Sequence, residues 1–291
     1  RAGVALMLWL ARLPIRIQQI FHPFEIDPPP ALPTPPAEPK FSVIVSSHNY
    51  QHLMAQTLDS LLVQTYRKFE IIVVDDGSTD RSVELIQRYV RDHPRVVSLY
   101  QHPQGANRGL AASLRLGAEN ASGEYLAFCE ADDLWTPDHL DEIVRLIRDH
   151  GAPVWIANDV DIFGDPWRCL KMELANARRI RSRCRRTINH FSFDEFRRAN
   201  WILTFSACSV RRPEFLALDF NGNPWPEHTD WWLWRQMAAR YPLFYVNRKL
   251  TRWRMHQSYV TRARPTPERW QRFRQELDRL LMQCPSGPHV L

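Results

Sequence analysis

Three carboxylates lie within four residues at the end of the segment Gly123–Trp135, GEYLAFCEADDLW. Tyr125–Cys129 is a short apolar run, typical of a buried strand, and Glu130, Asp132 and Asp133 follow it. Carboxylates at the carboxyl end of such a strand stand where open α/β sheets bind their ligands. Because these charges repel one another, they need a cation nearby, and Mg²⁺ or Mn²⁺ accepts oxygen ligands and bridges to phosphates. Taken alone, a solvated acidic turn explains the segment equally well.

Two earlier apolar runs also end in polar clusters. Residues 46–49 read Ser-Ser-His-Asn and residues 75–78 read Asp-Asp-Gly-Ser. Ordinary turn residues explain any one cluster, but three clusters at one sheet edge favour a nucleotide site at a topological switch point. The sequence contains no GxxxxGK[ST] and no GxGxxG after the first strand, so phosphate charge would have to be balanced by a metal.

The elements that must position these clusters alternate along the chain. This rhythm predicts a parallel sheet with right-handed crossovers. The expected strands are Phe41–Ser46, Phe69–Val74, Val96–Tyr100 and Tyr125–Cys129, and the expected helices are Leu53–Gln64, Arg81–Asp92 and Leu110–Ala121.

Composition sets broad limits on the class of protein. A chain of 291 residues with 44% hydrophobic residues fits one large α/β domain or two small ones. The net charge of +6 favours anionic partners such as phosphates or an acidic membrane surface. The five cysteines form no CxxC pair, which argues against zinc and fits a reducing compartment.

The N-terminal residues differ from the rest of the chain. Residues 1–27 contain an apolar stretch with arginines, expected to form an amphipathic helix that lies on a membrane or packs on its own domain. It is too short to span a bilayer and lacks a signal-peptide cleavage pattern. Residues 28–39 are expected to form a stiff proline-rich linker.

Three blocks of the sequence resemble a known family. FSVIVSSHNY, SLLVQTYRKFEIIVVDDGSTD and GEYLAFCEADDLWTPDHL are similar to the inverting glycosyltransferases of family 2. The resemblance implies the GT-A fold, an α/β architecture with a Rossmann-like, mostly parallel sheet flanked by helices, here with N-terminal and C-terminal helical extensions. It implies a domain over residues 40–262, with a nucleotide half at 40–150 and an acceptor half at 151–262. Residues 263–291 would then carry a C-terminal helix.

The resemblance also implies roles for individual residues. Ser46 and Asp76 would contact the nucleotide base, and Asp132 would face the ribose. Asp133 would bind Mn²⁺ or Mg²⁺, and His256, in the closing segment of the family pattern, would complete the metal site.

The second half of the chain supplies the expected acceptor side. Pro226–Ala239 resembles the family's Glu-Asp pair ahead of a tryptophan-rich helix, with Thr229 in place of the Glu. The resemblance implies that Asp230 is the general base, because inversion requires removing a proton from the acceptor hydroxyl. Glu227 and Asp219 are rival carboxylates.

Two further segments carry patterns of their own. Arg178–Arg186 holds six arginines in nine residues, typical of a solvated loop, and its position also allows it to grip an anionic acceptor or lipid headgroups. Pro267–Gln283 is expected to be an amphipathic helix that packs on the domain or on another subunit.

The combined expectation is a metal-dependent inverting glycosyltransferase. It would move a sugar from a nucleotide sugar, first of all a UDP-sugar, to a saccharide or lipid-linked acceptor, as in surface polysaccharide assembly. We expect it in the cytoplasm, with peripheral contact with the inner face of the cell membrane left open, and without a nucleic-acid partner. The alternatives are a non-catalytic nucleotide- or sugar-binding GT-A domain of a larger assembly enzyme and a nucleotidyltransferase.

Overall fold

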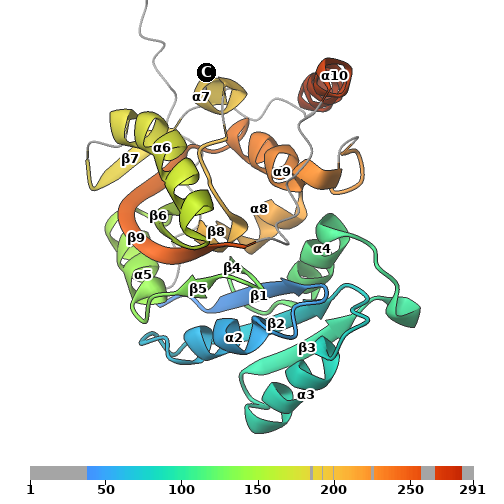
Figure 1. Ribbon diagram of the computed structural model, residues 1–291. Coiled ribbons are helices and arrows are strands. Elements are labelled where there is room, and N and C mark those ends of the chain that lie inside the picture. The colour runs from blue at the N-terminus through green and yellow to red at the C-terminus, as the bar shows by residue number, and fades with distance from the viewer. Residues whose placement is uncertain are drawn as a thin grey trace, which may run out of the picture.

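The computed structural model describes residues 38–183, 186–191, 193–198, 200–223, 226–256 and 266–283 (Figure 1). The expected N-terminal helix, nearly all of the proline-rich linker, and Cys184 and Arg185 of the arginine run lie outside these residues. Within the described ranges, no helix has the length and apolar character needed to cross a bilayer.

The first half of the domain is a parallel α/β sheet. Its four strands lie side by side in the order β3-β2-β1-β4, and every neighbouring pair is parallel. The bounds fall close to those expected from the sequence. The elements are β1 (Phe41–Ser47), α2 (Met54–Leu62), β2 (Phe69–Asp75), α3 (Ser82–Asp92), β3 (Val97–Gln101), α4 (Leu110–Asn120) and β4 (Tyr125–Glu130).

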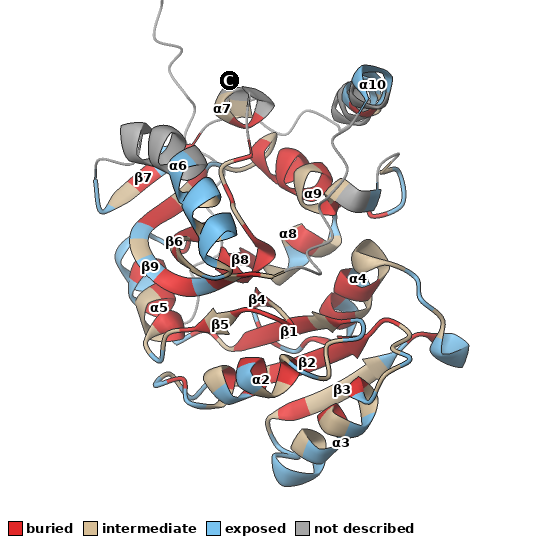
Figure 2. Cartoon of the chain, viewed as in Figure 1, coloured by how far each residue is buried: buried red, intermediate tan, exposed pale blue. Residues whose placement is uncertain are grey.

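Alternate residues of these strands enter two separate cores, as the period of a strand requires. Val43 and Val73 pack with residues of α2 and α3 on one face. Ile44 and Ile72 pack with residues of α4 on the other face. Figure 2 shows the resulting buried layer through the centre of the molecule. Both faces of the sheet are therefore covered, which leaves its strand ends as the place for a ligand.

The second half extends the same sheet but mixes strand directions. β8 pairs antiparallel with β4 and with β6, β6 runs parallel to β9, and β9 pairs antiparallel with β5 and β7. The expected parallel arrangement therefore holds for the first four strands, and beyond them the sheet is mixed because the strand–helix crossover rhythm stops after β4. The strands are β5 (Leu134–Trp135), β6 (Trp155–Gly164), β7 (Ile188–Phe191), β8 (Cys208–Arg211) and β9 (Leu243–Met255).

The sheet curls back on itself. β5 follows β4 after only a short turn, yet it pairs with β9 at the other end of the strand order. The far end of the sheet must therefore return to the turn that carries Asp132 and Asp133. This curl brings the end of β9 next to the acidic cluster.

In the second half, α6 and α8 pack against strands of the sheet, and α7 and α10 pack on α9 (Figure 1). Trp155 of β6 and Trp232 and Trp234 of α9 are fully buried and pack in the same core. Most of the tryptophan-rich helix therefore serves packing. The helices are α5 (His139–Asp149), α6 (Pro166–Arg183), α7 (Phe193–Arg198), α8 (Arg212–Leu216), α9 (Thr229–Ala238) and α10 (Pro267–Gln283), with short 3₁₀ turns at Pro103–Gly105, Phe205–Ala207 and Pro226–His228.

The C-terminal helix has the expected bounds and packs on the chain's own domain. Phe273 of α10 is buried, and its ring centroid lies 5.9 Å from that of Trp232 in α9. By contrast, the expected loop at the arginine run was wrong for Arg178–Arg183, because these residues form the last turns of α6.

Candidate functional site

The acidic cluster stands at the carboxyl end of β4, as the strand pattern predicts. Glu130 is the last residue of β4, and Asp132 and Asp133 lie in the turn to β5. Thr204 Oγ1 lies 2.7 Å from Glu130 Oε2 and 3.0 Å from Asp133 Oδ2. Ser206 Oγ accepts the backbone N–H of Glu130 at 2.8 Å. Thr204 and Ser206, in the segment before β8, thus hydrogen-bond to the residues of the cluster.

Asp133 is fully buried and points into the protein. Its Oδ2 accepts a hydrogen bond from Ser206 Oγ at 2.6 Å, and its Oδ1 accepts one from the backbone N–H of Arg254 at 2.9 Å. Together with Thr204, three donors of the chain engage its two oxygens. Asp133 therefore joins β4, β9 and the segment before β8.

Asp132 is also buried, with 7% of its surface exposed, but it has different partners from Asp133. His256 Nε2 lies 2.7 Å from Asp132 Oδ2, and the hydroxyl of Tyr50 is hydrogen-bonded to the same carboxylate. The rings of Tyr50 and His256 meet edge to face with centroids 6.3 Å apart. The structure therefore brings together Asp132 and His256, two residues that are 124 positions apart in the sequence.

Electrostatics in the cluster confirm the mutual repulsion of its carboxylates. Burial, followed by the charge of Asp132, raises the pKa of Glu130 to about 7. The same two causes, with the charge of Glu130 added, raise the pKa of Asp133 well above its ordinary value. Burial and the nearby carboxylates also raise the pKa of Tyr50. The cluster therefore favours protons or another positive charge at its centre.

Arg254 supplies one such charge from β9. Its Nε donates to the backbone carbonyl of Asp132 at 2.7 Å, and its Nη2 donates to Gln56 Oε1 at 2.8 Å. The guanidinium lies 4.5 Å from the ring centroid of Phe163. Arg254 is thus fixed by three elements beside the acidic turn.

The expected base-binding residues lie at the neighbouring strand ends. Ser46 is half-buried and stands opposite Glu130 in the parallel pairing of β1 with β4. Asp76 follows β2, and its two oxygens accept the backbone N–H groups of Arg108 at 2.6 Å and Gly109 at 2.9 Å. Asp76 therefore orients the loop that begins α4, which borders the same edge.

Gly77 is required by the same arrangement. Its φ is +73°, and an added Cβ would lie 2.7 Å from the backbone nitrogen of Asn107 and from the carbonyl of Gly105. Only glycine combines this conformation with so close an approach. The loop after β2 and the loop before α4 are thereby pressed together beside Asp76.

Asp230 lies in the first turn of α9 and faces the acidic cluster. Asn200 Nδ2 donates to its Oδ2 at 2.7 Å. Burial raises the pKa of Asp230 to about 6, although hydrogen bonds to the carboxylate oppose the rise. Its charge in turn contributes to the raised pKa of Glu130. The predicted base and the predicted nucleotide side therefore share one electrostatic site.

The two rival carboxylates differ in what the structure shows. Asp219 Oδ1 accepts the backbone N–H groups of Asn221 at 2.9 Å and Gly222 at 3.0 Å, so it caps its own turn. The side chain of Glu227 lies outside the described part of the structure.

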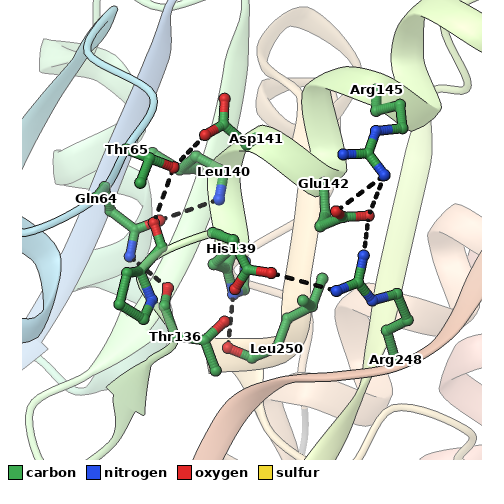
Figure 3. A network of polar contacts seen from close by, with 12 residues as sticks. Gln64, Thr65, Thr136, His139, Leu140, Asp141, Glu142, Arg145, Arg248 and Leu250 are labelled. Carbon is green, nitrogen blue, oxygen red and sulfur yellow. Dashed lines mark hydrogen bonds and ion pairs between the residues drawn. The ribbon is translucent and has the colours of Figure 1, made fainter.

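The segment after the acidic turn is locked to its surroundings by a polar network (Figure 3). Gln64 Nε2 donates to the carbonyl of Thr136 at 2.7 Å, and Gln64 Oε1 accepts the N–H of Leu140 at 3.0 Å. The His139 ring stacks on Trp135 with centroids 3.8 Å apart and hydrogen-bonds the carbonyl of Leu250 at 3.2 Å. α5 begins at His139, after the backbone of residues 136 and 137 has been engaged in this network.

Sequence reasoning missed several residues of the site. Tyr50, Asn200, Thr204 and Ser206 all contact the predicted carboxylates. Tyr50 ends the first resembling block and could have been noticed. The other three lie in a stretch without a recognisable motif, so only the three-dimensional arrangement reveals them.

Comparison with sequence families identifies the class of protein. The profile described as glycosyl transferase family 2 matches residues 42–211, more than half of the chain. The chain belongs to this family.

Two curated relatives match part of the chain. Glycosyltransferase alr2836 of Nostoc sp. is 37% identical over 110 residues, which are 38% of this chain and 33% of that protein. Glycosyltransferase GlyA of Streptococcus pneumoniae is 34% identical over 119 residues, which are 41% of this chain and 16% of that protein. The chain thus matches a third or less of the length of these two relatives.

Solved structures confirm the GT-A fold. S. aureus TarS 1–349 in complex with UDP superimposes with a TM-score of 0.62 at 17% identity, over 87% of this chain and 67% of that one. The mannosyltransferase PcManGT from Pyrobaculum calidifontis, in complex with GDP-Man and Mn²⁺, gives a TM-score of 0.53 at 18% identity, over 96% of this chain and 77% of that one.

Proposed function

We propose that this chain is a metal-dependent inverting glycosyltransferase that moves a sugar from a UDP-sugar to a saccharide or lipid-linked acceptor. One observation carries the proposal: Asp132 and His256 meet at the sheet edge, and Asp230 faces the same cluster from α9. In this proposal the nucleotide side and the proton acceptor belong to one site, which the electrostatic influence of Asp230 on Glu130 supports. Family membership supports the reaction class.

The donor set suits Mn²⁺ or Mg²⁺. Within the described ranges, no group of three or more His, Cys, Asp and Glu side chains is arranged to hold a metal ion. Asp132 and His256 offer one carboxylate and one imidazole, and such ions commonly take one or two protein ligands and complete their shell with substrate phosphates and water. When bound, the ion would offset the charge that develops on the leaving diphosphate.

The metal assignment to Asp133 stays a prediction, and the geometry favours another role for it. A metal at Asp133 would compete with Ser206, Thr204 and the backbone of Arg254 for its oxygens. We propose instead that Asp133 positions the turn and that Asp132 faces the ion.

The remaining residues bind and orient the substrates. Ser46 and Asp76 border the strand ends where the base and ribose would lie, and Arg254 places positive charge beside the diphosphate position. Asp230, oriented by Asn200, accepts the proton of the acceptor hydroxyl as the new bond forms. We propose UDP as the nucleotide because of the family resemblance and because the S. aureus TarS structure contains UDP.

A thermal-shift and turnover experiment tests the proposal. UDP with Mn²⁺ should raise the melting temperature more than UDP with EDTA or GDP with Mn²⁺, since a ligand of the folded state stabilises it by about 2.7 kcal/mol at a hundred times Kd. A panel of UDP-sugars should then yield one that releases UDP. Binding without UDP release from any sugar would favour the non-catalytic binding domain, and no shift with any nucleotide would contradict both readings.

A further inference from the structure

One side of α6 carries an unusual stripe of exposed apolar side chains. Trp167 is 81% exposed, Leu170 48% and Leu174 62%, and among the described residues Val63 is the one other large hydrophobic side chain so exposed. The spacing of three and four residues places the three on the same side of the helix. Figure 2 shows this part of α6 exposed to solvent.

The opposite side of α6 anchors the helix to the domain. Cys169 and Met172 pack against a small core that includes Val160, Trp253 and Met255. The apolar stripe is therefore exposed although the helix already packs another apolar side against the domain. The domain holds α6 with Trp167, Leu170 and Leu174 directed outward.

Positive charge is concentrated in the same helix. Arg168 and Lys171 lie among the stripe residues and are exposed, and four more arginines follow in the last turns of the helix. The six basic residues of α6 are opposed by Glu173 alone, so the helix accounts for five of the chain's six net positive charges. The basic residues are Arg168, Lys171, Arg178, Arg179, Arg181 and Arg183.

The helix starts at the rim of the candidate site. Gly164, at the end of β6, pairs with Met255 at the end of β9, and the backbone N–H of Asp165 donates to the carbonyl of Met255 at 2.8 Å. The next residue after Met255 is His256, which contacts Asp132. A surface that received α6 would therefore lie close to the site.

We propose that α6 docks on the surface of an anionic phospholipid bilayer. Trp167, Leu170 and Leu174 enter the boundary between headgroups and acyl chains, and the net positive charge of the helix attracts the anionic headgroups. This combination of an apolar face with Trp and Leu and a basic segment is what interfacial helices use. Docking on the bilayer does not depend on the proposed function. One consequence does rest on it: a lipid-linked acceptor would be presented beside His256.

Charge decides between a bilayer and a second copy of the chain. A two-fold symmetric contact through this stripe would place two copies of a helix with a net charge of +5 against each other. Repulsion would oppose that contact, whereas an anionic membrane surface attracts each Lys or Arg by about 1 kcal/mol.

Vesicle flotation tests the proposal with the full chain. We expect the protein to float with vesicles of phosphatidylcholine and phosphatidylglycerol and to remain unbound with phosphatidylcholine alone. The combined variant Trp167→Ser, Leu170→Ser, Leu174→Ser should lose at least about tenfold in partitioning, because three interfacial anchors are removed. Val63→Ser, which removes an exposed apolar side chain just after α2, should bind like the wild type.

A second pair of variants isolates the charge. Arg178→Glu with Arg181→Glu should abolish binding to anionic vesicles. Arg88→Glu with Arg91→Glu has the same charge change and spacing on α3, far from α6 (Figure 1), and should have a much smaller effect. Equal losses in both pairs would show a general charge effect and overturn the role of α6.

The remaining outcomes are equally decisive. Wild-type binding by the triple variant would move the docking surface elsewhere, for example to residues 1–27. A wild-type dimer that the triple variant converts to monomers, without vesicle binding, would show that a second copy covers the stripe. UDP affinity is measured in parallel: all variants should retain it, and its absence in the wild type would contradict the proposed function while leaving the vesicle result standing.

Discussion

Asn200 donates a hydrogen bond from Nδ2 to Oδ2 of Asp230 at 2.7 Å. The same Asn200 accepts the backbone N–H of Ile202 through its Oδ1 at 3.1 Å, so its amide orientation is fixed by the chain. Thr204 and Ser206, which hold the acidic cluster, follow within the same segment. One short stretch of chain therefore orients both the proposed base and the proposed nucleotide side.

The first prediction concerns the base. Asp230→Asn keeps the shape of the side chain and its hydrogen bond from Asn200 but removes the proton acceptor. Because a general base acts in the transition state, UDP-sugar binding should stay near normal while transfer falls by roughly 10²–10⁴-fold. Calorimetry with UDP and a steady-state transfer assay measure the two effects.

Glu227→Gln is the matched control for this variant. It makes the same chemical change three residues earlier, and we expect much less loss of transfer. Loss of transfer in Glu227→Gln with normal rates in Asp230→Asn would show that Glu227, and not Asp230, is the general base. Normal rates in both variants would contradict the inverting mechanism itself.

The second prediction concerns pH. Burial raises the pKa of Asp230 to about 6, so the folded state binds a proton more tightly than the unfolded state. Asp230 therefore destabilises the fold increasingly as pH rises from about 4 through 6, and the full effect is present above pH 6. Asp230→Asn should be more stable than the wild type by up to about 3 kcal/mol at pH 8, and by about 1 kcal/mol at pH 4.5.

Denaturant unfolding at the two pH values measures this difference. Asn200→Asp serves as the comparison, because a second carboxylate next to Asp230 should lower stability at pH 8 and less at pH 4.5. A stability gap between wild type and Asp230→Asn that does not change with pH would mean that Asp230 keeps its ordinary pKa. In the transfer assay, the wild type should lose kcat/KM as pH falls through about 6.

The sequence predicted the first half of the fold closely because that half repeats a simple physical rule. β-branched runs such as Phe69–Val74 alternate with amphipathic helices, and each crossover constrains the direction of the next strand. The second half lacks this rhythm. No local pattern indicated that β8 would lie antiparallel between β4 and β6, or that β9 would curl back to β5.

The site follows the same division. Asp132 and Asp76 could be placed at the sheet edge because they directly follow strands of the regular half. Adjacent carboxylates such as Asp132 and Asp133 look alike in sequence, and only their contacts in the structure distinguish them. Thr204 and Asn200 contact carboxylates that lie at least 30 positions away in the sequence, so no local spacing could predict these contacts.

The third prediction concerns the nucleotide. Asp76→Ala removes the acceptor of two backbone N–H groups in the loop before α4, at Arg108 and Gly109. We expect the fold to survive with a loss of about 1–3 kcal/mol and UDP affinity to fall, since the loop borders the base position. Asp80→Ala is the control for stability alone. It removes another carboxylate of the loop after β2, which accepts the backbone N–H groups of Ser82 and Gln51. UDP affinity equal to that of the wild type would remove Asp76 from the site.

The last prediction separates the two adjacent aspartates. The family resemblance gives the metal to Asp133, so that Asp133→Ala should abolish transfer together with the metal-dependent part of UDP binding. The contacts in the structure favour Asp132 instead, because three donors of the chain engage Asp133, whereas Asp132 contacts His256 and Tyr50. Substitution by Asn preserves shape at both positions and weakens metal binding at whichever one holds the ion.

We therefore expect Asp132→Asn to lose the gain in UDP affinity that Mn²⁺ provides and to keep wild-type stability. Asp133→Asn should keep most of that gain, and Asp133→Ala should lower the free energy of unfolding by about 1–3 kcal/mol, because it leaves the buried hydroxyl of Ser206 without its acceptor. UDP titrations with Mn²⁺ and with EDTA give the comparison. The reverse result, with the Mn²⁺ effect lost in Asp133→Asn and kept in Asp132→Asn, would restore the assignment to Asp133. Turnover that is unchanged in EDTA would contradict metal dependence for either aspartate.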